Sequence, residues 1–240
     1  MRHALCCISL MLGLASSLEA AFEHPEVGAR AAGLGEAYVA LAHDPEGVYW
    51  NPACLVDLPE TSASFSYSYP FNLGELAGSC GCVAVSSHVG WLGAGILSYG
   101  FELYRETTLA FSYANAVRPG LSIGLNLKGN RLAIEDFGVG HTFALDVGCL
   151  AEVSERFHWA MAAWNLLGTH LADEPLGQTL TLGAAFCPAE RLTLCIDARK
   201  DLERGLQIQG GAEYVLADYV RLRAGAGDAP TRFSCGIGID

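Results

Sequence analysis

The residues of this 240-residue chain that could perform chemistry are its histidines, cysteines and acidic side chains, and their spacing gives little sign of a catalytic site. The sequence has no P-loop and no HExxH motif. Ser112, Asp146 and His158 are residue types that a hydrolase uses, but they fall on different predicted strands. We therefore expect no enzymatic activity and no cofactor. The histidines are interpreted as solvated or turn residues: His24, His43, His88, His141, His158 and His170.

The cysteines do not form a recognisable metal site. Seven of the nine lie beyond residue 20, and an odd number cannot pair completely within one chain. No CxxC occurs, and no Cys/His group has zinc spacing. Cys80 and Cys82 would share one face of a strand, which is too weak a pattern to predict a metal. We expect no bound metal, and we expect most of the cysteines to act as small apolar residues.

Composition limits the class of protein. The chain is 51% hydrophobic, only 17% charged, and carries 28 glycines, so it can bury a core and is not disordered. Its 26 acidic and 14 basic residues give a net charge of −12, which argues against a nucleic-acid partner. Such a composition is typical of an all-β protein, a membrane protein, or both.

The first residues predict export. Residues 1–20 contain an early Arg2, an apolar run from Ala4 to Ala15 and then small residues, which is the arrangement of a cleavable signal peptide. We expect cleavage after Ala20. The apolar run is shorter than the roughly 20 residues that a spanning helix needs.

Two zones follow the signal. Ala29–Ala42 is the only convincing helical stretch, and a turn-rich segment comes after it. From Thr61 onward, apolar and polar residues alternate in about twelve segments, mostly of a length that suits tilted membrane strands. The uncharged, glycine-rich stretch from Leu76 to Phe101 is read as two strands joined at residues 86–88. Short turns at regular spacing predict an all-β, antiparallel up-and-down meander.

A meander with one apolar face can close as a soluble fold with that face inward, or as a transmembrane β-barrel with that face outward. Leu182 and Leu194 are assigned to the apolar face, and Thr181 to a wet lumen. Aromatic residues near the predicted turns favour the membrane barrel, because interfacial girdles lie there. These aromatic residues are Tyr67, Tyr69, Tyr99, Phe101, Tyr104, Phe157, Trp159, Trp164, Tyr214 and Tyr219.

Residues 28–58 read GARAAGLGEAYVALAHDPEGVYWNPACLVDL. The segment resembles the N-terminal signature of the PorV/PorQ-like outer-membrane proteins, a branch of the FadL-type long-chain fatty acid transporter superfamily. This sequence departs from the family pattern at His43, where the family has Asp, and at Cys54, where the family has Gly. Matching residues include Gly28, Arg30, Gly33, Gly35, Asp44, Trp50, Asn51, Pro52 and Ala53.

Beside the signal peptide that the residues predict over 1–20, the resemblance implies an N-terminal helical plug over 21–58 and a barrel of about 12–14 strands over 59–240. It implies structural roles for the matching residues, with Arg30, Asp44 and Asn51 bonding to backbone or charges inside the lumen. Members of the family usually end in an aromatic residue, whereas this chain ends in Gly-Ile-Gly-Ile-Asp. The last strand or two, and closure of the barrel within these residues, are therefore left open.

Three functions remain at this stage. The first is a barrel of the cell outer membrane, with lipid as its surroundings, that passes or binds a hydrophobic small molecule. The second is a non-transporting accessory of a type IX-like secretion machine, with secretion proteins as partners. The third is a soluble periplasmic β-protein.

Overall fold

The computed structural model describes residue 22 and residues 27–59, 61–171, 174–202 and 205–239. The N-terminal part holds α2 (Ala29–Gly33), α3 (Gly47–Trp50) and the 3-10 helix η1 (Pro52–Asp57); η2 (Pro70–Asn72) and η3 (Gly74–Leu76) follow later. The main strands are β1 (Thr61–Ser68), β2 (Gly78–Ser87), β3 (Gly90–Gly100), β4 (Tyr104–Arg118), β5 (Leu121–Ile134), β6 (Gly138–Ser154), β7 (Phe157–Trp164), β10 (Thr179–Ala189), β11 (Leu192–Asp201), β12 (Leu206–Ala217), β13 (Val220–Asp228) and β14 (Thr231–Ile239). Two short strands, β8 (His170–Leu171) and β9 (Glu174–Pro175), pair only with each other.

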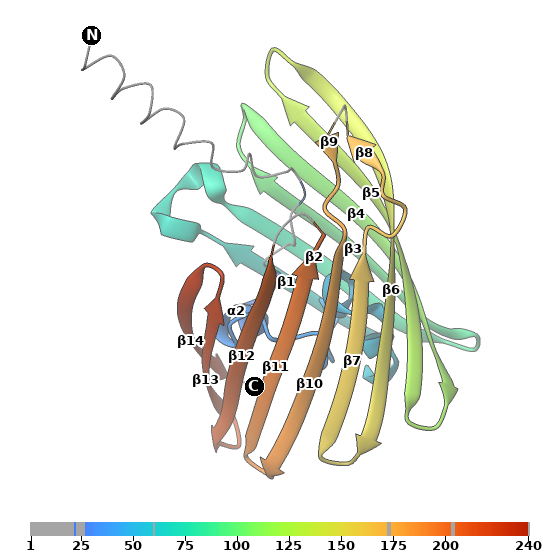
Figure 1. The fold of residues 1–240 in the computed structure, drawn as a ribbon, viewed down its shortest axis with the longest axis vertical. Coiled ribbons are helices and arrows are strands. Elements are labelled where there is room, and N and C mark those ends of the chain that lie inside the picture. The colour runs from blue at the N-terminus through green and yellow to red at the C-terminus, as the bar shows by residue number, and fades with distance from the viewer. Residues whose placement is uncertain (1–21, 23–26, 60, 172–173, 203–204, 240) are drawn as a thin grey trace.

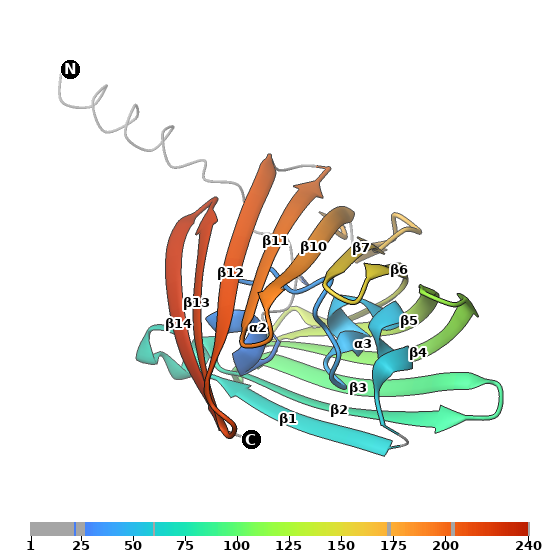
Figure 2. The same cartoon turned by 90° about the horizontal axis from the view of Figure 1, so that it is seen from below.

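The main sheet is a twelve-stranded meander in which each strand pairs antiparallel with its neighbours in the chain. Figure 1 shows the strands side by side, and Figure 2 shows the sheet curving around α2 and α3. The predicted all-β, up-and-down architecture with an N-terminal helical segment is confirmed. The soluble alternative required an apolar face turned inward, which is not the arrangement found.

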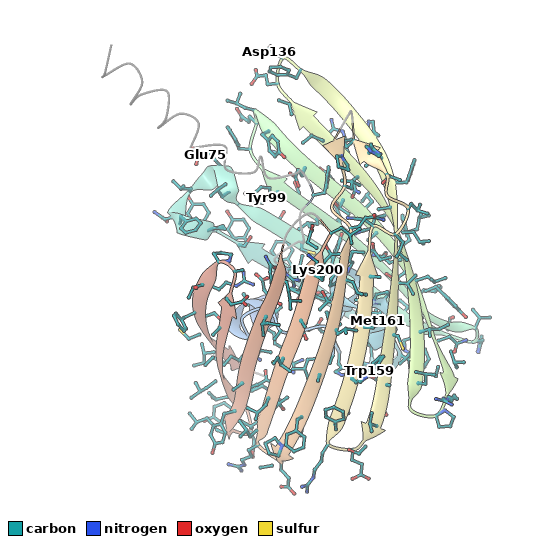
Figure 3. The ribbon with its side chains drawn as sticks, viewed as in Figure 1. Glu75, Tyr99, Asp136, Trp159, Met161 and Lys200 are labelled. Atoms are coloured by element: carbon teal, nitrogen blue, oxygen red, sulfur yellow. The ribbon has the colours of Figure 1, made fainter. Side chains whose placement is uncertain are left out.

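The two ends of the sheet differ in their connections. At one end the turns 88–89, 119–120, 155–156, 190–191 and 218–219 each contain two residues. Most connections at the other end are longer, among them 69–77 and 165–178, although only residues 229–230 join β13 to β14. Figure 3 places Glu75 and Asp136 at this long end and Trp159 toward the short-turn end. Short turns on one side and longer loops on the other are typical of outer-membrane barrels.

Side chains alternate between the two faces as the period-2 pattern predicts. On β10, Leu182 is 50% exposed on the outer face, whereas the neighbouring Thr181 is completely buried on the inner face. Leu194 on β11 is also exposed, so both leucines lie on the predicted face. Among the aromatic residues expected near the rims, Trp164 is buried on the inner face, and Tyr99 and Tyr104 also fall at inward-facing positions of β3 and β4.

The predicted helix over Ala29–Ala42 is wrong in length. Only Ala29–Gly33 is helical, and Gly35 and Glu36 then take left-handed backbone conformations with φ of 65° each. An α-helix cannot continue through two such residues, and glycine at position 35 makes the first of them easy to adopt. The chain therefore turns, which frees the backbone N–H groups of Tyr38 and Val39 to bond to the sheet.

Two further expectations concern the stretch 76–101 and the signal peptide. The stretch 76–101 does form two strands, β2 and β3, although their turn lies at residues 88–89, slightly later than expected. The predicted signal peptide falls outside the described residues. In the described part of the chain, no helix is long and apolar enough to cross a membrane.

The hydrogen-bonded order begins at β1 and ends at β14. Among the described residues, these two strands each pair with one neighbour and not with each other. The curved sheet is thus open along one line between them, and the part boundaries at residues 20 and 58 remain predictions.

The outward position of Leu182 generates the first prediction. We expect Leu182→Arg to destabilise the protein in lipid by about 2–4 kcal/mol, because Arg at mid-depth on a lipid face is costly. Ala189→Arg is the matched control at the end of the same strand, where the cost is about 0–1 kcal/mol. Urea titration of folding in lipid vesicles measures both, and equal values would contradict the assignment of this face to lipid.

A second substitution, Thr181→Arg, tests the inner face. A wet lumen would keep an arginine hydrated at this position, but Thr181 is fully buried on the inner face. Arg at this position must displace the groups that bury Thr181, so we expect a loss of stability in the same assay.

Candidate functional site: the plug and its seat

The candidate site is the N-terminal segment of residues 27–58, here called the plug, together with the inner face of the sheet that holds it. Nearly every plug side chain is buried, and Leu34, Tyr38 and Trp50 have no exposed surface. Tyr38 and Trp50 contact each other edge to face, with their ring centroids 5.6 Å apart. Figure 2 shows α2 and α3 inside the curve of the sheet.

Glycines in the wall let the plug approach the strands closely. A Cβ atom at Gly124 of β5 would lie 2.4 Å from the backbone nitrogen of Ala53. One at Gly148 of β6 would lie 2.0 Å from Asn51 Oδ1, and one at Gly225 of β13 only 2.1 Å from the nitrogen of Gly35. No side chain fits at these three positions, so the wall and the plug are matched in shape. We call these three glycines the glycine seat.

Asn51 fixes the middle of the plug. Its Nδ2 donates to the carbonyl oxygens of Val39, at 3.0 Å, and of Cys149 on β6, at 3.2 Å. Its Oδ1 accepts from Ala53 N at 3.1 Å, which caps η1, where Pro52 is the first residue. The predicted structural role of the Trp-Asn-Pro-Ala segment is consistent with these bonds, since Asn51 ties two parts of the plug to the wall.

Arg30 lies in an ion-pair network with the last strands. Its Nε and Nη2 donate to the two carboxylate oxygens of Glu213 at 3.1 and 3.0 Å, and Arg223 Nε donates to the same carboxylate at 2.6 Å. Glu36 accepts from Arg199 at 3.4 Å and from Arg232 at 2.7 Å. Two carboxylates, one in the wall and one in the plug, thereby join β11–β14 to α2 and the turn after it.

Two wall residues satisfy the irregular backbone of the plug. Asp197 Oδ2 on β11 accepts from the N–H groups of Tyr38, at 2.8 Å, and Val39, at 3.0 Å. Asn126 Nδ2 on β5 donates to Val48 O at 2.9 Å. Such bonds are needed because non-helical backbone away from water must find partners in the protein. Sequence reasoning did not identify these partners; a polar residue in the middle of an otherwise apolar strand was the available signal.

The three residue types considered for hydrolysis do not assemble into a triad. Ser112 donates to Asn126, which donates to Asp146, so these residues support the plug. His158 makes an edge contact with His43 instead. Residues 120–124 match GxSxG, but they span a two-residue turn and the start of β5 rather than the strand-to-helix turn of a nucleophile elbow. No cluster of three metal-ligating side chains occurs in the described residues.

A second polar group surrounds Asp44. Its carboxylate accepts from Tyr38 Oη and, at 3.1 Å, from Glu46 N. Burial, followed by the charge of Asp44, raises the pKa of Glu46 to about 7. Burial also raises the pKa of Tyr38 well above its usual value, so Tyr38 stays protonated. Gly28 lies against Glu46 with φ of 95°, and a Cβ there would overlap the carboxylate, so this position needs glycine.

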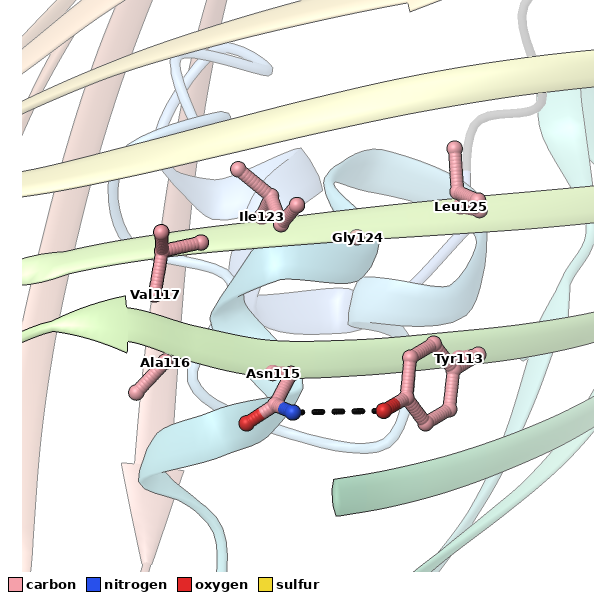
Figure 4. A pocket seen from close by; sticks show the side chains of 7 residues that line it. All are labelled: Tyr113, Asn115, Ala116, Val117, Ile123, Gly124 and Leu125. Carbon is pink, nitrogen blue, oxygen red and sulfur yellow. Dashed lines mark hydrogen bonds between the residues drawn. The ribbon is translucent and has the colours of Figure 1, made fainter. Parts of the chain in front are cut away.

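Two hollows are lined mainly by outward-facing residues of the sheet. One of about 330 Å³ is lined by residues of β4 and β5, mainly on their outward face, including Tyr113, Val117 and Ile123. Figure 4 shows Asn115 donating to Tyr113 Oη across it. Another of about 290 Å³ lies beside Trp159, Leu182 and Ile196.

The glycine seat generates a prediction with a control on the same strand. Gly124→Ala should destabilise plug docking by about 1–3 kcal/mol, because its Cβ meets plug backbone that cannot move aside cheaply. Gly129→Ala should have little effect, since its Cβ would approach only the Phe143 ring, at 3.7 Å. Hydrogen–deuterium exchange of the plug amides measures the difference. If both variants exchange equally, close contact at Gly124 is not what holds the plug.

The raised pKa of Glu46 generates a pH prediction. The folded state holds this proton more tightly than the unfolded chain, so stability should fall as pH rises from about 4.5 to about 7. Glu46→Gln removes the titration and should stabilise the protein at pH 8, by up to about 3 kcal/mol, but not at pH 4. Thermal unfolding in detergent at both values tests this. Glu75→Gln, at an exposed loop position, is the control; a similar gain from it would refute the role of burial.

Comparison with known proteins agrees at the level of the fold. No protein-family model and no curated protein matches the chain. Among solved structures, a Pseudomonas aeruginosa FadL homologue matches with a TM-score of 0.64 and 11% identity, covering 85% of this chain and 80% of that one. The CymD monoaromatic hydrocarbon channel gives 0.63 at 13% identity, with 86% and 84% covered.

The Pseudomonas putida toluene transporter TodX matches with a TM-score of 0.59 and 11% identity, over 84% of this chain and 83% of that one. At sequence identities of 11–13%, these similarities concern the fold alone. The curved antiparallel sheet of this chain therefore has the fold of FadL-type barrels.

Proposed function

We propose that the protein is a barrel of the outer membrane that passes or binds a hydrophobic small molecule, and that its plug closes the lumen. The observation that carries this proposal is the division of the sheet into two faces. Large apolar side chains lie exposed along the outside of nearly every strand, while the inside is occupied by a buried polypeptide segment. A water-soluble protein would bury that outer face, whereas a lipid bilayer covers it.

The chemistry of the plug contact supports a removable closure. Many of its bonds are hydrogen bonds and ion pairs, such as those of Asn51, Arg30 and Asp197, and water can replace them when the plug moves. Plug side chains pack against the inner face of the sheet in two apolar clusters, so we expect a solute to pass through the lumen more readily when the plug shifts. The wall does not depend on the plug for its strand-to-strand bonds.

The likeness in fold supports a hydrophobic solute. Two similar structures are a monoaromatic hydrocarbon channel and a toluene transporter. The arrangement of connections further suggests an orientation, with the two-residue turns facing the periplasm and the longer connections facing outward.

The PorV/PorQ-like signature at residues 28–58 supports the second candidate, an accessory of a type IX-like secretion machine. The two functions share the barrel and differ in partners. Co-purification from native membranes distinguishes them, since secretion proteins would copurify stoichiometrically with an accessory but not with a transporter.

The plug is tested by loosening it. Asn51→Asp removes two donors and places a carboxylate against the carbonyl groups of Val39 and Cys149, so the plug should detach more often. We expect conductance in planar bilayers to rise, as it should when residues 28–48 are deleted, while heat-modifiable gel migration persists. Asn115→Asp, exposed on the outer face, is the control. If neither Asn51→Asp nor the deletion of residues 28–48 changes the conductance, the plug does not close the lumen.

A further inference from the structure

Arg199 of β11 is buried on the inner face of the sheet with two of its donors unused. Its side chain is only 7% exposed, and its Nη1 donates to Glu36 of the plug at 3.4 Å. Nε and Nη2 share one edge of the planar guanidinium, and neither has a hydrogen-bond partner among the described residues. Two donors on one edge match the two oxygens of a carboxylate. A buried group left in this state indicates that something else binds there.

Two indole rings lie close to this guanidinium, one from the plug and one from the wall. The ring centroid of Trp50 is 5.8 Å from Arg199 Cζ, and that of Trp164, at the end of β7, is 5.9 Å away. Thr181 of β10 is opposite Arg199 in the sheet, and its buried Oγ1 also has no partner in the described part of the chain. The wall therefore offers a cation, an aromatic ring and a hydroxyl group in one place.

The plug occupies this place with an aromatic ring and a carboxylate of its own. Glu36 accepts from Arg232 of β14 at 2.7 Å as well as from Arg199, and Trp50 brings its indole to the same guanidinium. The charges that act on Arg199 are those of Glu36, Asp197 and Arg232. When Glu36 leaves, two guanidinium groups and the carboxylate of Asp197 remain in the wall. One further carboxylate then restores neutrality.

We propose that this part of the wall, here called the arginine patch, binds an aromatic carboxylate when the plug moves away. The patch consists of Trp164, Thr181, Arg199 and Arg232. The carboxylate of the ligand takes the place of Glu36, and its ring takes the place of the Trp50 indole. The inference rests on the proposed function, since the solute must enter the lumen, and it narrows the hydrophobic small molecule to one with a charged end.

The patch favours an aromatic acid over two simpler classes of molecule. An uncharged aromatic molecule leaves the Nε and Nη2 donors of Arg199 without an acceptor, and an unmet buried donor is costly. An aliphatic acid supplies the acceptor but gives the guanidinium no aromatic face to contact. An aromatic carboxylate supplies both groups, as the plug does with Glu36 and Trp50.

Competition between ligand and plug couples binding to opening. A ligand that binds only the undocked state increases the population of that state. Benzoate, which is ionised at pH 7, should therefore increase hydrogen–deuterium exchange of the plug amides. In Asn51→Asp the plug should detach more often, and the apparent affinity rises with the fraction of protein that is competent to bind. Benzoate should thus bind more tightly to Asn51→Asp than to the parent.

The test uses the full chain folded in detergent, with calorimetric titration and hydrogen–deuterium exchange of the plug. Benzoate should bind at least about tenfold more tightly than toluene, which has the ring but no acceptor. It should bind about two- to fivefold more tightly than cyclohexanecarboxylate, which has the charge and nearly the same size but no aromatic face. Asn51→Asp should bind benzoate about tenfold more tightly than the parent does.

Arg199→Lys separates the pair of donors from the charge, because lysine keeps the positive charge beside Glu36 but lacks the planar edge. It should lose the response of plug exchange to benzoate. Lys200→Gln is the matched control, since it removes the neighbouring cation, which is exposed on the outer face (Figure 3). This variant should respond to benzoate as the parent does.

Three results would overturn the proposal. Benzoate may bind neither the parent nor Asn51→Asp, Arg199→Lys may respond as the parent does, or cyclohexanecarboxylate may bind as tightly as benzoate. The last result would mean that the patch recognises a carboxylate alone. Absence of benzoate binding would leave the conductance test of the plug intact, and unchanged conductance would leave the titration intact, so the two proposals fail separately.

Discussion

The rest of the lumen depends on one constraint: the backbone of the plug lies very close to the backbone of the wall. Gly124 and Gly148 receive the Asn51–Ala53 turn, and Gly225 receives Gly35, at distances that leave no room for a methyl group. This contact brings Asn51 to the carbonyl of Cys149 and Asp197 to the amides after Gly35. A glycine in a strand interior weakens the strand, so its cost is offset here by the plug it admits.

Once the backbones are close, the irregular part of the plug needs hydrogen-bond partners, since it has neither a long helix nor a sheet of its own. Wall residues provide them from both sides of the lumen: Asn126 from β5 and Asp197 from β11. The ion pairs of Arg30 and Glu36 add charge complementarity at β11–β14. Buried ion pairs contribute little net stability, but a wrongly placed plug would leave their charges unpaired, so they favour one position.

Sequence patterns predict the faces of the sheet because alternation is local, and Leu182, Leu194 and Thr181 lie on the expected sides. The segment with Asn51 and Pro52 was found through its resemblance to a family. What the sequence could not provide was the pairing of distant residues: Arg30 meets Glu213, and Tyr38 meets Asp197. The sequence pattern also predicted too long a first helix, because hydrophobic periodicity does not reveal the left-handed turn at Gly35 and Glu36.

The wall and the plug differ in the groups that form hydrogen bonds with their backbone amides. Strand amides bond to neighbouring strands, so the wall keeps its hydrogen bonds whether or not the plug is present. Plug amides bond to side chains such as Asp197, which water can replace in a polar lumen. The inner face also contributes apolar side chains, among them Leu150 and Trp164, to a buried cluster with plug residues such as Tyr38, so departure of the plug would expose apolar surface. Polar contacts therefore specify where the plug docks, and the apolar clusters that it shares with the wall stabilise the docked position.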